Sequence, residues 1–168
     1  MAEAREQQRI DRGGRLGGFI YGTIIVLSVI VAAAQAFPHQ PGRVAGLVIA
    51  TTFVFWLAHV YAHALGHSVA HDERVSPDEL RRIAYRERSI IEAGVPSIVA
   101  LLGGALGLIS EDVAVWVAVG LGIAVLATQG LWFARVERLS GLGTLTVIAA
   151  NVGLGVALVA LKLVVSHY

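Results

Sequence analysis

The amino-acid sequence predicts an all-α, polytopic membrane protein, a bundle of five transmembrane helices with one interfacial amphipathic helix. The first observation is composition, since 56% of the 168 residues are hydrophobic and 15% are charged, with a mean hydropathy of +0.71. A soluble domain of ordinary composition is less apolar than this. The others are five long apolar runs and basic residues confined to alternate connections between them. We expect a single transmembrane domain over residues 1–168.

The five apolar runs are long enough to cross a bilayer. A hydrocarbon core about 30 Å thick needs about 20 helical residues. The first run follows a charged segment and lacks both the short apolar core and the small-residue cleavage site of a signal peptide, so we interpret it as a span. The predicted spans are residues 16–37, 44–66, 91–109, 113–134 and 142–165.

The distribution of Lys and Arg predicts the orientation of these spans. Basic residues gather before the first, third and fifth spans, whereas only Arg43 and Lys162 fall on the other side. By the positive-inside rule, the N-terminus is then cytoplasmic and the C-terminus lies outside. We therefore expect a multi-pass protein of the inner membrane. The use of Arg at 12 of the 13 basic positions, together with many Ala, Gly and Val residues, suggests a bacterial gene.

Two connections carry helix-start signals. Ser76, Pro77 and Glu79 form a capping box, which predicts an amphipathic helix over residues 77–90 at the cytoplasmic headgroups, feeding directly into the third span. Ser110, followed by acidic residues, is expected to cap the fourth span. The loop before it is so short that the third and fourth spans should form an antiparallel hairpin.

Small residues recur at four-residue spacing on every predicted span. Such stripes let helix backbones approach closely, so we expect a tightly packed bundle. The stripe on the second span lies beside a row of histidines, so we expect this row to face protein and not lipid. The stripes are Gly14/Gly18/Gly22, Ala58/Ala62/Gly66/Ala70, Gly103/Gly107, Ala114/Ala118/Gly122 and Ala149/Gly153/Ala157.

The row of histidines is the most informative feature of the sequence. His59, His63, His67 and His71 recur every fourth residue and are four of the six histidines in the chain. A four-residue step on an α-helix rises about 6 Å and overshoots one turn by about 40°, so the four share a face. Because the row covers about 18 Å, neighbouring rings can share one ion or proton but all four cannot.

Depth along the spans predicts a polar layer in the cytoplasmic half of the bundle. Measured from the outer ends of their helices, His59, Glu92 and Gln129 all lie about 22 to 25 Å down. Tyr21 lies about 7 Å from the inner boundary, at nearly the same level. Ionisable side chains inside a membrane span usually face a protein interior or a cavity, which favours a functional role for this layer.

Glu92 has a second peculiarity. Pro96 cannot donate the hydrogen bond that the Glu92 carbonyl would otherwise accept, so we expect the third span to kink there. The carboxylate and the freed carbonyl would then form a cation or proton site. The structural alternative is that Glu92 lies at the interface and pairs with Arg88 or Arg135.

Two uses of the polar layer stay open at this point. In one, His59, His63 and Glu92 bind a divalent transition metal (zinc, copper or iron), or the histidines bind haem. In the other, imidazoles that titrate near neutrality relay protons towards the cytoplasm. The residues of that ion pathway or proton relay would be His59, His63, His67, His71, Glu92, Gln129 and Tyr21.

We expect the protein to conduct or carry protons or divalent metal ions, in a lipid bilayer and as a homo-oligomer or a subunit of a membrane complex. One alternative is a metal- or haem-dependent membrane enzyme acting on a lipid-soluble substrate. Another is a non-catalytic accessory or scaffold subunit. The absence of cysteine excludes disulfides and thiolate chemistry, and a net charge of +1 gives no reason to expect a nucleic-acid partner.

Overall fold

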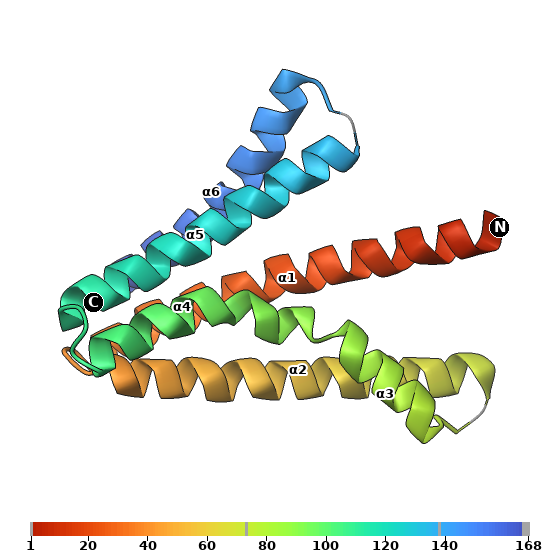
Figure 1. Ribbon diagram of the computed structural model, residues 1–168, viewed down its shortest axis with the longest axis horizontal. Helices are drawn as coiled ribbons and strands as arrows, with labels where there is room; N and C mark the ends of the chain where they lie inside the picture. Colours follow the sequence, from red (N-terminus) through yellow and green to blue (C-terminus); the bar gives the residue numbers. More distant parts are fainter. Residues whose placement is uncertain (1, 73, 138, 166–168) are drawn as a thin grey trace.

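Six α-helices make up the described part of the chain, coloured in chain order in Figure 1. The computed structural model describes the backbone of residues 2–72, 74–137 and 139–165, and over these ranges it contains no strand. The all-α prediction is thus confirmed. The helices are α1 (Ala2–Ala36), α2 (Pro41–His71), α3 (Pro77–Arg86), α4 (Ser89–Ala105), α5 (Glu111–Val136) and α6 (Gly141–Val165).

Several of these helices could cross a membrane. Residues Leu16–Ala36 of α1, Pro41–Ala70 of α2 and the whole of α5 are long and apolar enough to do so. A fourth span is possible if α3 and α4, which meet at a bend of 43°, are taken together. The apolar part of α6 described here, Gly141–Ala157, is shorter. The architecture is consistent with a membrane helical bundle. By length and composition, three or four helices could span the membrane, whereas five spans were predicted.

Helix α1 lies at the centre of the bundle, because it packs against α2, α4, α5 and α6. Helices α4 and α5 pack side by side as the predicted hairpin, and α6 packs along α5. The connections at residues 37–40 and 106–110 lie together at one end, which we call the short-turn end, and α3 lies towards the other, the α3 end (Figure 1).

A layer of fully buried aliphatic side chains fills the middle of the bundle. It consists of residues from four helices, each with no exposed surface, and Leu27 of α1 is central to it. A Cβ atom built on Gly122 of α5 would lie 2.6 Å from Leu27 Cδ2, so this glycine makes the room that the leucine fills. The layer is Leu27, Ile30, Val48, Leu101 and Leu126.

The small-residue stripes have divided roles. On α1 the prediction of close packing is right, because a Cβ on Gly22 would lie 2.8 Å from the carbonyl oxygen of Ile90 on α4. On α2 the stripe is exposed, and nothing lies within 4 Å of a Cβ on Gly66. The histidine helix therefore does not bury its small residues inside this chain, contrary to expectation. The physical reason is that α2 packs on α4 and α1 through the face of Val44, Val48 and Thr52.

The helix ends confirm one predicted cap and correct two other expectations. Ser76 Oγ accepts a hydrogen bond of 3.2 Å from the Glu79 amide, as the capping box requires, but α3 ends at Arg86 rather than near residue 90. Ser110 precedes α5 without a side-chain cap bond; its carbonyl accepts from Ala114 instead. The chain also bends by 43° between α3 and α4, at residues 87–88; α4 itself continues through Pro96, and the kink expected there stays a prediction.

Candidate functional site

A carboxylate is buried where α3 meets α4. Ile83 of α3 is only 5% exposed, and Glu87 follows it by four residues, so both lie on the same face of the turn. The Glu87 amide still donates to the Ile83 carbonyl at 3.0 Å, which keeps the side chain on that face although the helix ends. As a result, only 10% of the Glu87 side chain is exposed.

Two basic groups compensate the buried carboxylate. His63 Nδ1 on α2 lies 3.6 Å from Glu87 Oε1, and Arg86 Nε lies 3.5 Å from the same oxygen. A buried carboxylate needs such partners because moving an unpaired charge from water into the protein is costly. The His63 side chain is 45% exposed, so the pair is accessible from one side. We call His63 and Glu87 the His63–Glu87 pair.

The histidines on α2 bond to their own helix. His59 Nδ1 lies 2.9 Å from the Phe55 carbonyl oxygen, and His63 Nδ1 lies 3.0 Å from the His59 carbonyl oxygen. A carbonyl can only accept, so we assign the hydrogen of each neutral ring to Nδ1. Nε2 is then the basic nitrogen in both rings, and it is the atom that can take up a proton.

An aromatic wall from α1 and α2 lies next to the pair. The rings of Tyr21 and His59 are 5.2 Å apart between centroids, tilted by 49°, and Tyr21 also meets Phe55 edge-on at 6.2 Å. The predicted proximity of Tyr21 and His59 is therefore realised. His59 is half-buried as a result, one turn of helix from the more exposed His63.

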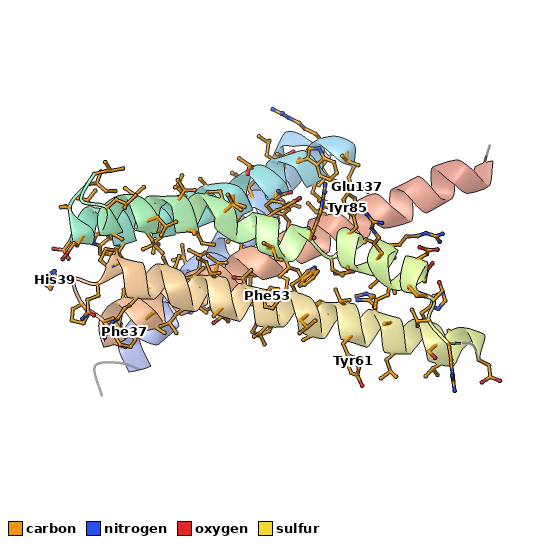
Figure 2. All side chains as sticks on the ribbon, turned by 60° about the horizontal axis from the view of Figure 1, so that its bottom comes forward. Phe37, His39, Phe53, Tyr61, Tyr85 and Glu137 are labelled. Carbon is orange, nitrogen blue, oxygen red and sulfur yellow. The ribbon has the colours of Figure 1, made fainter. Side chains whose placement is uncertain are left out.

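A tryptophan fixes α3 to α2 at this site. Trp56 Nε1 donates a hydrogen bond of 3.1 Å to the carbonyl oxygen of Ala84. Ala84 precedes Glu87 by three residues, so the bond anchors the same segment that carries the carboxylate. Tyr61 lies on the opposite side of α2 and points away from α3 (Figure 2). The site therefore occupies the face of α2 that meets α3.

Glu92 does not join the histidines in the way the sequence suggests. Its Oε1 lies 2.9 Å from Arg88 Nε, one turn earlier, which is the structural alternative considered above. The Arg88 guanidinium also lies 3.8 Å from the centroid of the Tyr85 ring. Both members of the Arg88–Glu92 contact are more than one-third exposed, so it is a surface ion pair at the start of α4.

The remaining predicted residues are spread along the bundle. Gln129 is half-buried on α5, a helix that packs mainly on α4 and α6 and scarcely touches α2. His67 is half-buried one turn beyond His63. The side chain of His71 lies outside the described residues. Over the described part of the chain, His, Asp and Glu form no group of three or more arranged to hold a metal ion.

Sequence reasoning missed Glu87, although a signal was present. The apolar positions of α3, Leu80, Ile83 and Ala84, continue at the next helical step to Glu87. A carboxylate in register with an apolar stripe is a sign of a buried ionisable group. The signal is masked by the arginines around Glu87, which dominate the charge of the segment.

No family model, curated protein or solved structure matches this chain. Its function has to be derived from the geometry of its own residues.

Proposed function

We propose that this chain is an integral membrane protein that carries protons, with the His63–Glu87 pair as its proton-binding site. The membrane setting is supported by the long apolar helices of the bundle. In the proposed orientation all five apolar helices span the bilayer, and the α3 end, with its arginines, faces the cytoplasm.

The observation that carries the proposal is the 3.6 Å contact between His63 Nδ1 and Glu87 Oε1. Imidazole exchanges protons near neutral pH, and its basic Nε2 is left available by the bond that Nδ1 makes to the helix. When Nε2 takes up a proton, the ring becomes a cation in a partly desolvated place. The Glu87 carboxylate supplies the counter-charge that such a cation needs.

The closed layer of aliphatic side chains favours a carrier over an open pore. Leu27, Leu101 and Leu126 have no exposed surface and lie between the α3 end and the short-turn end. The hydroxyls in the same region are already engaged, since Thr52 donates to the Val48 carbonyl and Ser97 to the Ala118 carbonyl. A proton bound at the pair therefore reaches the other end only if the helices rearrange.

Proton uptake by reconstituted vesicles tests this function. The full-length protein is placed in liposomes that contain a pH-sensitive dye, and a potassium gradient with valinomycin drives uptake. We expect faster internal acidification than in protein-free liposomes, and a rate near that background in His63→Ala. His39→Ala, at the opposite end of the bundle, serves as the matched histidine control. Acidification no faster than in protein-free liposomes would refute the carrier.

A further inference from the structure

A cavity of about 220 Å³ opens at the short-turn end of the bundle. It lies between the last turns of α1, the connection at residues 37–40 and the first turns of α5. Its floor is apolar, with Val31 and Val119 buried and Val115 half-buried. Trp116 of α5 forms one wall and is 72% exposed, so the cavity continues onto the outer surface of the bundle.

The mouth of this cavity is acidic. Glu111 and Asp112 both line it, and their side chains are 50% and 76% exposed. His39 faces them from the turn, with Nδ1 3.4 Å from Asp112 Oδ1 and 3.8 Å from Glu111 Oε2. Figure 2 shows His39 and Phe37 together at this end. The guanidinium of Arg43 also lies at this end, 5.6 Å from the centroid of the Phe37 ring, and Phe37 lines the cavity.

We propose that this cavity binds an amphiphile with a quaternary ammonium head. The negative mouth attracts a cation, and the Trp116 ring offers the aromatic face on which alkylammonium groups are bound. The valine floor suits the carbon atoms attached to the head, as in most small-molecule sites, where an apolar lining carries a few polar groups. This inference is independent of the proton-carrier proposal, because it uses none of the same residues.

The size of the cavity defines how much of the ligand it holds. Its volume equals about seven water molecules at about 30 Å³ each, which fits a trimethylammonium head and a few carbon atoms. A longer alkyl chain of the ligand would extend out of the cavity past Trp116. This residue lies about 8 Å along α5 from the first residue of the helix. Two sources present this chemistry, the choline head of a phospholipid and a free amphiphilic cation.

Equilibrium binding tests the proposal. Benzyltrimethylammonium, which is small and water-soluble, is titrated by calorimetry into the full-length protein in dodecyl maltoside micelles, with benzoate as the anionic counterpart. We expect saturable binding of the cation alone. The affinity should fall by about tenfold or more in Glu111→Gln/Asp112→Asn and in Trp116→Leu. It should be unchanged in Glu137→Gln, which makes the same chemical change at the far end of α5.

Added lipid identifies the source. Displacement of the probe by phosphatidylcholine, but not by phosphatidylglycerol, assigns the site to a lipid headgroup, whereas binding that survives both lipids assigns it to a free cation. Absence of saturable binding, equal binding of benzoate, or unaltered affinity in both cavity variants would overturn the proposal. Because the acidic residues lie in the first turn of α5, the Trp116→Leu result stands even if the double variant fails to fold.

Discussion

Glu87 Oε1 and His63 Nδ1 lie 3.6 Å apart, although Glu87 is the C-cap of α3 and His63 lies in the second half of α2. The contact joins a buried carboxylate to a half-exposed imidazole at the bend that leads into α4. Because Trp56 anchors the same segment through the Ala84 carbonyl, the carboxylate is held against α2 by the fold itself. The proposed proton site thus depends on how α3 docks.

The interaction between the two residues should be measurable as a coupling free energy. In a double-mutant cycle with His63→Ala and Glu87→Gln, we expect about 0.2 to 1 kcal/mol, because His63 is nearly half exposed. Arg86 is retained in all four proteins. Unfolding by denaturant in detergent provides the values, and a coupling free energy of zero would contradict the contact.

The docking of α3 should weaken when the tryptophan bond is removed. Trp56→Phe keeps an aromatic ring but deletes the donor to the Ala84 carbonyl, at a cost of about 1 kcal/mol. We expect faster hydrogen exchange of the α3 amides, measured by mass spectrometry. Trp132→Phe, on the exposed side of α5, is the control. Equal exchange in the two variants would show that α3 is held in another way.

Close packing of α1 on α4 should depend on one glycine. A methyl group at Gly22 meets the backbone of Ile90, which cannot move away as a flexible side chain would. Gly22→Ala should therefore destabilise the protein by about 1 to 3 kcal/mol. Gly120→Ala has open space around it and should be neutral or stabilising by up to about 1 kcal/mol. Thermal unfolding in detergent compares the two, and a Gly22→Ala protein as stable as the Gly120→Ala protein would argue against this packing.

Metal analysis distinguishes between protons and divalent metal ions, the two cargoes that the sequence suggests. We expect the purified protein to hold no stoichiometric zinc, copper or iron and no haem absorbance, because Glu92, the carboxylate of the metal site predicted from the sequence, is in contact with Arg88 instead. Elemental analysis and a visible spectrum of wild type and His63→Ala provide the check. Bound metal that His63→Ala removes would reinstate the metal site.

Much of the fold follows from local patterns in the sequence. Apolar runs of helical length place the long helices, and the Ser76–Glu79 cap is confirmed by a hydrogen bond. Both patterns work because their physics involves residues that are near each other in the chain. The orientation in a membrane and the fifth span stay predictions, since neither depends on contacts within the bundle.

The candidate site was harder to predict because it depends on tertiary packing. Equal depth brought His59 and Tyr21 together as expected, but depth does not say which way a helix faces. Glu92 was expected at the level of the histidines, but it pairs along its own helix with Arg88. Glu87 becomes the partner of His63 only because the chain bends at residues 87–88, and no local pattern encodes that bend.

The measurement that tests the central claim most directly compares two carboxylates in the vesicle assay. Glu87→Gln removes the counter-charge of His63, whereas Glu92→Gln makes the same change in a surface ion pair five residues away. We expect proton uptake near the protein-free background in Glu87→Gln and close to wild type in Glu92→Gln, with both variants folded by circular dichroism. Wild-type uptake in Glu87→Gln, or its loss only in Glu92→Gln, would contradict the assignment of the proton site to the His63–Glu87 pair.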